Sequence, residues 1–309
     1  MTVGSVMVLG AGGFIGRRLV QALAAAGRPV IAVSRHAANF DHDGVEQVVG
    51  ELRAAEDFRP LLARSQTVVH VASNSTPASS AGLPLAEITG NLYPTLALLQ
   101  AMQSFPDRGL LYLSSGGCLY ASSAPTGVSE KAPPDPRSYH GAGKVAAESF
   151  ISAWTSQFRT SATILRPSNV YGPGQAARTG FGIVPTAFAR MLKDETLTVW
   201  GDGSSVRDYL FIDDLVALCL KMIATPMPSG ARMFHAGSGE GVSLRNLLAV
   251  MEHASGKRLR RIYEASRAVD ANCVVLDSSE VRNAYDWKPA VTLEAGLRRT
   301  WEWFTTTQR

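Results

Sequence analysis

The glycine loop near the N-terminus constrains the fold of this chain more than any other feature. An apolar run at residues 6–9 leads directly into a glycine-rich turn at residues 10–16, and residues 17–26 then have an amphipathic helical pattern. Glycines allow positive φ and a close approach of a ligand to the backbone, and a helix N-terminus offers unpaired N–H groups to an anion. This strand–turn–helix order predicts a dinucleotide-binding site. Its expected contacts are Gly10, Gly13, Phe14, Ile15, Gly16 and Arg17.

Composition and charge limit the class of protein. The 309 residues are 46% hydrophobic and 18% charged, which is enough chain for a large core or for two closely joined domains. The basic residues behind the net charge of +4 are scattered, so we expect no nucleic-acid partner. No apolar run reaches membrane-spanning length. Three distant cysteines, Cys118, Cys219 and Cys273, indicate a reducing compartment and no metal site. We therefore expect a cytoplasmic protein without a membrane or metal partner.

Short apolar segments alternate with helical patterns through the first half of the chain. The expected strands are residues 29–33, 45–49, 67–71, 109–114 and 162–166. Helices are expected at residues 84–103, with a break near Pro94, and at residues 140–158. This alternation predicts an α/β fold with a doubly wound parallel sheet of the Rossmann type, covered by helices on both faces.

The alternation stops after Pro167, and this change predicts two domains. We expect residues 1–167, with a returning segment at about 203–225, to form the dinucleotide-binding domain. Residues 168–309 are expected to form a smaller α/β domain for the substrate. Loops rich in Ser, Gly and Pro at residues 73–84 and 121–137 should lie over the carboxyl ends of the strands, where ligands bind in such sheets.

The end of the second strand bears on the choice of dinucleotide. Sites that prefer NAD usually place an acidic residue there to bind the ribose 2′-hydroxyl, whereas an arginine accommodates a 2′-phosphate. This strand ends in Ser34 and Arg35, and Arg17 lies beside the loop, so NADP is slightly favoured over NAD. Arg35 could instead stack on the adenine or point to solvent. Glu51, followed by Leu52, is a candidate adenine contact.

Several further motifs follow one another in a fixed order along the whole chain. They are His70-Val71-Ala72, Asn91 to Thr95, Ser114-Ser115 before Leu119-Tyr120, residues 165–173, Gly201-Asp202-Gly203 with Arg207-Asp208-Tyr209, and Gly237-Ser238-Gly239. Together with the glycine loop, this series resembles the extended short-chain dehydrogenase/reductase family, within it the nucleotide-sugar epimerase/dehydratase group.

The resemblance implies a bound nicotinamide that oxidises a sugar carbon to a ketone and returns the hydride. It places further cofactor contacts at Ala72, Asn91, Lys144 and Pro167. It also implies that Asn169 contacts the phosphates of a nucleotide sugar, that Arg207 and Arg267 clamp the diphosphate, with Asp270 near them, and that Val199 lies in a strand whose backbone holds uracil or thymine. Arginine suits the diphosphate because its planar fork can bond two oxygens.

The same resemblance implies a homodimer. The helices that bear Asn91 and Lys144 resemble the pair that forms a four-helix bundle between subunits in this family. Trp154 and Phe158, four residues apart on one helix, are either contacts of that interface or residues of the core.

The expected catalytic pair departs from the family pattern. The family uses Tyr-x-x-x-Lys on a helix; Lys144 is present, but His140 stands four residues before it and Tyr139 is one place too early. Gly116 falls where the family has Ser or Thr, and Ser115 is only its neighbour. Three interpretations remain: His140 carries the proton, an irregular helix start brings Tyr139 into place, or the pocket binds ligands without catalysis.

The sequence thus favours an NAD(P)-dependent nucleotide-sugar epimerase that acts on a UDP- or dTDP-sugar through a transient keto-sugar. A ketoreductase or dehydratase would use the same hydride chemistry. A non-catalytic protein that binds a sugar nucleotide or the redox cofactor is the alternative of another class.

Overall fold

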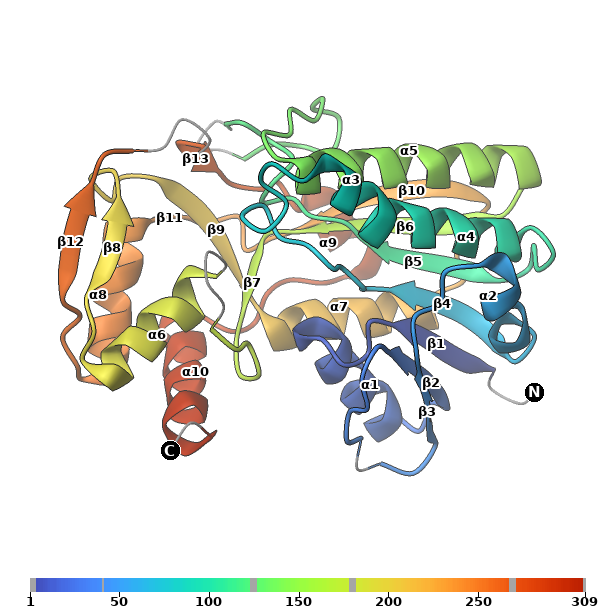
Figure 1. The fold of residues 1–309 in the computed structure, drawn as a ribbon, viewed down its shortest axis with the longest axis horizontal. Helices are drawn as coiled ribbons and strands as arrows, with labels where there is room; N and C mark the ends of the chain where they lie inside the picture. Colours follow the sequence, from blue (N-terminus) through green and yellow to red (C-terminus); the bar gives the residue numbers. More distant parts are fainter. Residues whose placement is uncertain (1–3, 41, 123–126, 178–181, 267–270, 308–309) are drawn as a thin grey trace. The chain divides into compact units, whose positions relative to one another are not determined.

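The chain forms two compact units in a computed structural model that describes residues 4–40, 42–122, 127–177, 182–266 and 271–307 (Figure 1). Unit 1 comprises residues 1–115, 139–166 and 216–234, and unit 2 comprises residues 116–138, 167–215 and 235–309.

Unit 1 is built on a seven-stranded sheet in the order β10-β6-β5-β4-β1-β2-β3. The strands from β6 to β3 are all paired in parallel. Their sequences are largely apolar because helices cover both faces, as in a doubly wound fold. The strands are β1 Ser5–Leu9, β2 Val30–Ser34, β3 Val45–Val49, β4 Ser65–His70, β5 Gly109–Leu113, β6 Ser161–Pro167 and β10 Gly230–Ala236.

The helices of unit 1 lie on two sides of this sheet. Figure 1 shows α4 and α5 along one face and α1 and α7 along the other. The predicted helix at residues 84–103 is divided into α3, a π-helical turn η1 and α4, with Pro94 in the first turn of α4. The helices are α1 Phe14–Ala25, α2 Ala55–Leu62, α3 Pro84–Glu87, η1 Ile88–Leu92, α4 Tyr93–Met102, α5 Tyr139–Phe158 and α7 Ile212–Ala224, which belongs to unit 1 from residue 216 onward.

Unit 2 contains smaller sheets. Strand β9 pairs with β7, β11 and β13, while β8 and β12 form a separate parallel pair. Phe188 packs against Trp301 and Phe304 with ring centroids 5.3 and 5.9 Å away, which joins α6 to α10. The elements are β7 Asn169–Tyr171, α6 Ile183–Lys193, β8 Leu197–Trp200, β9 Val206–Phe211, β11 Gly241–Ser243, α8 Leu244–Ser255, β12 Arg261–Glu264, β13 Cys273–Val274, α9 Ser279–Tyr285 and α10 Leu293–Thr307.

The units differ in their boundaries from the domains expected from the sequence. Residues 116–138 belong to unit 2, because the Gly116 amide donates to the Pro167 carbonyl and the Val128 amide to the Val275 carbonyl. In unit 1 the segment after residue 167 is residues 216–234, which overlaps the returning segment expected at about 203–225. The assignment of separate cofactor and substrate domains stays a prediction.

A hydrophobic core fills the space between the sheet and helices α2, α4 and α5. Phe58 on α2, Leu98 on α4 and Ile151 on α5 are buried in it. Trp154 of α5 belongs to the same core, with 4% of its surface exposed. Trp154 is therefore a core residue and not an intersubunit contact, whereas Phe158 is 38% exposed.

A buried ion pair ties helix α5 to the sheet. Arg166 at the end of β6 donates from Nε and Nη2 to the two carboxylate oxygens of Glu148, at 2.9 and 2.5 Å. The Ser114 hydroxyl, just after β5, donates to the same carboxylate at 2.5 Å. Because both charged side chains are buried away from water, each is stabilised by the opposite charge of the other.

We predict that Glu148→Ala lowers the free energy of unfolding by about 3–5 kcal/mol, because it leaves the Arg166 charge buried without its partner. Urea denaturation measures this change. Glu46→Ala is the matched control, since Glu46 pairs with Arg64 on the exposed surface and its removal should change little. Equal losses in the two variants would contradict the role assigned to the buried pair.

In the part of the chain that the structure describes, no helix combines the length and the apolar character that a bilayer crossing requires.

Candidate active site

The glycine loop between β1 and α1 has the geometry of an anion cradle. Gly10 has φ +90°, and a Cβ there would come within 2.7 Å of the Ala72 backbone. A Cβ on Gly16 would lie 2.1 Å from the Gly10 carbonyl oxygen, so only glycine lets the helix begin this close to the strand. No side chain caps α1 at Gly13 and its first turn holds no acid, which leaves N–H groups and the helix dipole for a phosphate. These residues fit a dinucleotide.

Several of the other predicted cofactor contacts lie at the carboxyl edge of the same sheet. Leu9, the last residue of β1, is in register with Val33 of β2 and with His70 of β4, so the loops that follow these strands share one edge. Arg35 is exposed just after β2, and Arg17 donates from Nη1 to the Asn39 carbonyl at 3.2 Å.

The remaining predicted cofactor contacts differ in their burial and in their bonding partners. The Ser34 hydroxyl donates to the His36 carbonyl at 2.8 Å. Glu51 is exposed and paired with Arg53 at 2.7 Å. Leu52 and Ala72 are half-buried, and Pro167 is buried at the end of β6. Their cofactor contacts stay predictions.

Helix α5 presents His140 and Lys144, one turn apart, to the interior of unit 1. Their exposed fractions are 8% and 7%. The Lys144 ammonium donates to the Leu113 carbonyl at 3.0 Å and lies 4.9 Å from the centre of the Tyr112 ring. Tyr139 begins the helix and is 46% exposed. The buried position one turn before the lysine is therefore occupied by the histidine and not by the tyrosine.

His140 is held by side chains from another segment. Its Nδ1 lies 2.8 Å from the Ser75 hydroxyl and 4.0 Å from a carboxylate oxygen of Glu87. Its backbone N–H donates to the Ser80 hydroxyl at 3.2 Å. Burial, and next the positive charge of Lys144, lower the pKa of His140 to about 4. The imidazole is thus neutral at physiological pH and able to accept a proton.

Two members of this cluster, Ser75 and Glu87, were absent from the expected site. The Ser75 hydroxyl contacts Glu87 at 2.5 Å, and the Asn91 amide bonds both residues at 2.9 Å. The π-helical turn η1 places Asn91 and Glu87 around the same serine, and such turns are frequent at functional sites. A glutamate inside the apolar segment at residues 84–103 was the available signal, because a buried acid requires partners.

Asn91 and Ser115 differ in their hydrogen-bond partners and in their surroundings. The side chain of Asn91 also accepts from the Asn74 amide at 2.7 Å, so its amide already has three protein partners. Ser115 is half-buried after β5, beside Ser114. The predicted cofactor contact of Asn91 and the predicted catalytic role of Ser115 stay predictions.

A second buried histidine lies near Lys144. Nε2 of His70 contacts the Thr95 hydroxyl at 3.1 Å, and its ring meets Tyr112 edge-on at 5.3 Å. Burial and then the charge of Lys144 lower the pKa of His70 to about 3. His70 is therefore a neutral packing residue at the end of β4.

Three of the predicted substrate contacts lie in unit 2. Asn169 donates to the Asp208 carbonyl at 2.9 Å, Arg207 is half-buried and donates to the Val206 carbonyl at 2.9 Å, and Val199 is buried on β8. The predictions for Arg267 and Asp270 lie outside the described residues.

Asp208 anchors the loop that follows β10. Its carboxylate accepts from the amide and hydroxyl of Ser238 and from the Gly239 amide. Burial nonetheless raises the pKa of Asp208 above its ordinary value. Because Asp208 adjoins Arg207 on β9, this network fixes the strand from which the arginine extends.

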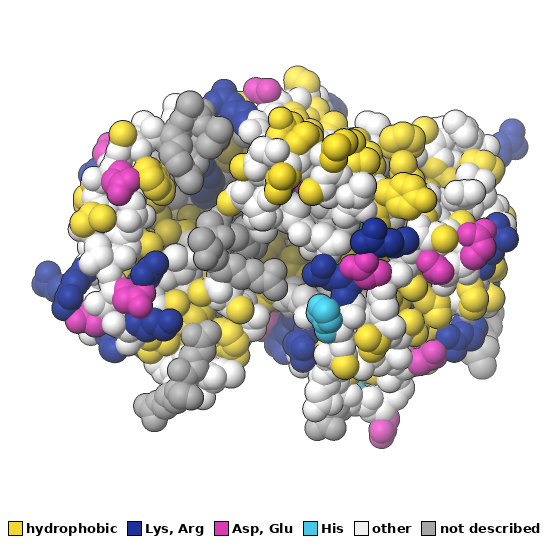
Figure 2. Space-filling view, viewed as in Figure 1, with side chains coloured by type: hydrophobic (Ala, Val, Ile, Leu, Met, Phe, Trp, Pro, Cys, Tyr) yellow, Lys and Arg dark blue, Asp and Glu magenta, His cyan; other side chains and the backbone are white. Residues whose placement is uncertain are grey.

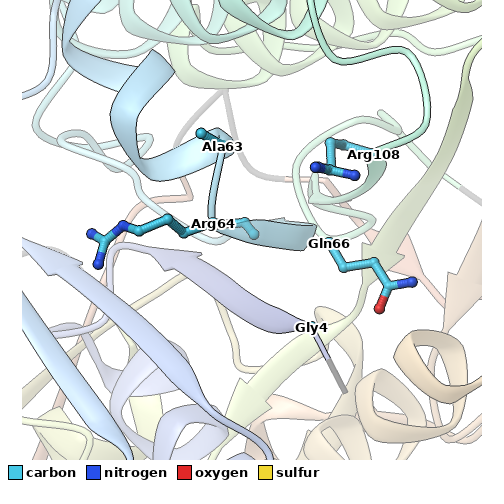
Figure 3. Close-up of a pocket in the computed structure, with 6 residues that line it drawn as sticks. Gly4, Ala63, Arg64, Gln66 and Arg108 are labelled. Atoms are coloured by element: carbon cyan, nitrogen blue, oxygen red, sulfur yellow. The ribbon is translucent and has the colours of Figure 1, made fainter. Parts of the chain in front are cut away.

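A surface pocket lies at the opposite edge of the unit 1 sheet. Gly4, Ser65 and Arg108, just before or at the amino ends of β1, β4 and β5, line it together with Ala63, Arg64 and Gln66. Figure 3 shows the side chains of Arg64, Gln66 and Arg108 around this pocket. None of the predicted site residues lines it. Among the described residues, no three His, Cys, Asp or Glu side chains are grouped to hold a metal ion.

The glycine cradle at the carboxyl edge of a parallel sheet defines a dinucleotide-binding α/β protein. The chain belongs to the NAD dependent epimerase/dehydratase family, whose model matches residues 6–237. This membership confirms the family resemblance drawn from the motifs, and the family is one of enzymes.

Relatives and a solved structure extend this likeness over the whole chain. The UDP-glucose 4-epimerase of Mycolicibacterium smegmatis is 31% identical, over 96% of this chain and 97% of that protein. A dTDP-4-dehydro-6-deoxy-D-allose reductase of Streptomyces is also 31% identical, over 97% and 96%. The UDP-glucose 4-epimerase of Thermus thermophilus, solved in complex with NAD, has a TM-score of 0.90 at 28% identity, covering 98% of this chain and 99% of that one. The predicted fold class is confirmed.

Proposed function

We propose that this protein is an NAD(P)-dependent nucleotide-sugar epimerase that acts on a UDP- or dTDP-sugar through a transient keto-sugar. The observation that carries the proposal is the buried pair of His140 and Lys144, one turn apart on α5, in the place of the family's tyrosine and lysine. Similarity to epimerases and a reductase of nucleotide sugars supports the substrate class.

The residues of unit 1 divide the chemistry among them. The glycine cradle would hold a nicotinamide dinucleotide, which would supply the hydride acceptor and donor. His140 takes the proton of the reacting hydroxyl, because its ring is neutral at physiological pH. Lys144, whose charge lowers the pKa of His140, keeps the ring in this accepting state. The proton returns from His140 when the keto-sugar is reduced.

The residues of unit 2 would bind the nucleotide. Arg207 carries a fixed positive charge and a planar fork suited to a diphosphate. Asn169, whose Nδ2 bonds the Asp208 carbonyl, would contact the same phosphates, and the backbone at Val199 would hold the base. Arg267 and Asp270 complete this proposed set.

Three other functions differ from epimerisation in observable ways. A nucleotide-sugar ketoreductase is favoured by the Streptomyces relative and by an NADP preference, and it would consume reduced cofactor with net turnover. A dehydratase would release water from the same kind of substrate. A non-catalytic binding protein is favoured by Gly116 at the position of the family's Ser or Thr, and it would bind a nucleotide sugar without converting it.

We predict that His140→Ala abolishes turnover in a panel of UDP- and dTDP-sugars read by product NMR, while the Kd of the nucleotide sugar stays nearly unchanged. The reason is that the variant removes the proton acceptor and leaves Arg207 in place. In the wild type, kcat/KM should persist below pH 6.5 and fall only as the pH approaches about 4, where His140 becomes protonated.

Tyr139→Phe is the matched control and should remain active. An active His140→Ala variant would show that another group carries the proton. A wild type that binds a nucleotide sugar tightly but converts none would favour the non-catalytic alternative.

Arg35 supports a preference for NADP over NAD. It is exposed directly after β2, free of any bond to a described residue, on the edge that carries the glycine loop. We predict that wild type binds NADP more tightly in calorimetric titration, and that Arg35→Asp reverses the order by repelling the 2′-phosphate. Arg59→Asp, the same charge change on α2, should leave the order unaltered. Equal affinities of wild type for the two dinucleotides would contradict the preference.

A second copy of the chain is the partner that we propose for one face of unit 1. Large apolar side chains are exposed on α3, η1, α4 and α5, as in Leu85 (73%), Tyr93 (57%) and Phe150 (48%). Figure 2 shows hydrophobic side chains gathered over these helices. A monomer rarely exposes such a patch without a use for it.

Light scattering at micromolar concentration should return the mass of a homodimer. Phe150→Asp should convert it to a monomer, because it places a charge in the proposed interface. Tyr263→Asp, at an exposed aromatic residue of β12, should stay dimeric. A monomeric wild type would refute the proposed assembly.

A further inference from the structure

The Ser75 hydroxyl is the centre of a closed hydrogen-bond network in unit 1. Its oxygen lies 2.5 Å from Glu87 Oε2, 2.8 Å from His140 Nδ1 and 2.9 Å from Asn91 Nδ2. Glu87 is 4% exposed and His140 8% exposed, so these polar groups depend on one another for hydrogen bonds.

The direction of each bond follows from one backbone group. The Asn74 N–H can only donate, and it bonds Asn91 Oδ1 at 2.7 Å, which identifies the other end of that side chain as the NH₂. That NH₂ therefore donates to Ser75 Oγ and to Glu87 Oε1, both at 2.9 Å. The carboxylate of Glu87 only accepts, so the single Ser75 proton goes to Glu87.

The tautomer of His140 is then determined. The Ser75 hydroxyl donates its only proton to Glu87, so Ser75 Oγ can only accept a hydrogen bond from His140. The ring proton of His140 is therefore on Nδ1. Nε2 bears the lone pair and makes no hydrogen bond to any residue that the structure describes. The network thus leaves one ring nitrogen free to take a proton.

We propose that Ser75 and Glu87 are positioning residues that hold His140 in the Nδ1–H tautomer, with Nε2 as the proton acceptor and Glu87 as the counter-charge to the imidazolium. This inference rests on the proposed function of His140. In the step, the O–H bond of the sugar hydroxyl breaks and a new N–H bond forms at Nε2, while the C–H bond of the same carbon breaks and its hydride would pass to the nicotinamide that the glycine cradle would hold. The proton and the hydride both return when the keto group is reduced. The Glu87 carboxylate, 4.0 Å from Nδ1, stabilises the cation in between.

Helix α5 leaves space for the Glu87 carboxylate at Gly143. A Cβ on Gly143 would lie 2.6 Å from Glu87 Oε1 and 2.8 Å from Glu87 Cγ. The absence of a side chain at Gly143 therefore lets Glu87 of α3 reach the helix that carries His140. The charged groups that face His140 are Glu87 from α3 and Lys144 from α5.

The ring tautomer is tested by ¹⁵N NMR of the full-length protein at neutral pH, independently of activity. In wild type, the unprotonated ring nitrogen should correlate with both carbon-bound ring protons, which identifies it as Nε2; His140→Ala assigns the signals. Ser75→Ala should lose this tautomer, Ser75→Thr should keep it, and Glu87→Gln should keep it because Gln can still accept from Ser75. A wild-type ring protonated at Nε2 would overturn the proposal.

Kinetics with the converted nucleotide sugar test the counter-charge. Ser75→Ala and Glu87→Gln should each lower kcat by about 10²- to 10⁴-fold, with KM changed by less than about threefold, as expected when only the orientation and charge of a base are lost. Ser149→Ala, at an exposed serine of α5, is the matched control and should be unchanged. Gly143→Ala, checked for folding by circular dichroism, should lower kcat because it displaces Glu87.

The outcomes separate this inference from the proposed function. If His140→Ala is inactive but Ser75→Ala and Glu87→Gln turn over like wild type, the positioning proposal fails and the function stands. If wild type converts no nucleotide sugar while its ring holds the Nδ1–H tautomer, the proposed function fails and the assignment of the ring stands.

Discussion

Burial of polar side chains between helix α5 and the α3–η1 segment is the constraint on which the candidate active site depends. A buried polar group without a partner costs free energy, so each group here must be satisfied by another. Ser75, Glu87 and Asn91 satisfy one another, and one ring nitrogen of His140 has no hydrogen bond to the residues that the structure describes. The Glu148–Arg166 pair meets the same requirement further along α5 and anchors that helix to β6.

The sequence predicts the parts of this fold that depend on local pattern. The glycine loop and the strands expected at residues 45–49 and 109–114 follow from apolar runs and turn residues, and the interruption near Pro94 follows from the geometry of proline. Helix α2 was not among the expected elements, because Pro60 lies inside it and interrupts the pattern. The resemblance to the family depends on the order of several motifs along the chain, and no single motif would indicate it.

The parts that the sequence did not predict depend on contacts between distant segments. Ser75 and His140 are 65 positions apart, and neither residue alone indicates that the two side chains meet. The placement of residues 116–138 with unit 2 depends on backbone bonds to Pro167 and Val275. Helical spacing alone could not distinguish Trp154 as a core residue from an interface residue, because both are apolar positions on one face.

We propose that His140 carries the proton that tyrosine carries elsewhere in this family. The most direct measurement is a crystal structure of the protein with its dinucleotide and the nucleotide sugar. We expect His140 Nε2 to lie about 2.6–3.2 Å from the reacting hydroxyl while Nδ1 stays bonded to Ser75. A Tyr139 hydroxyl in that position, or a His140 ring turned away from the sugar, would contradict it.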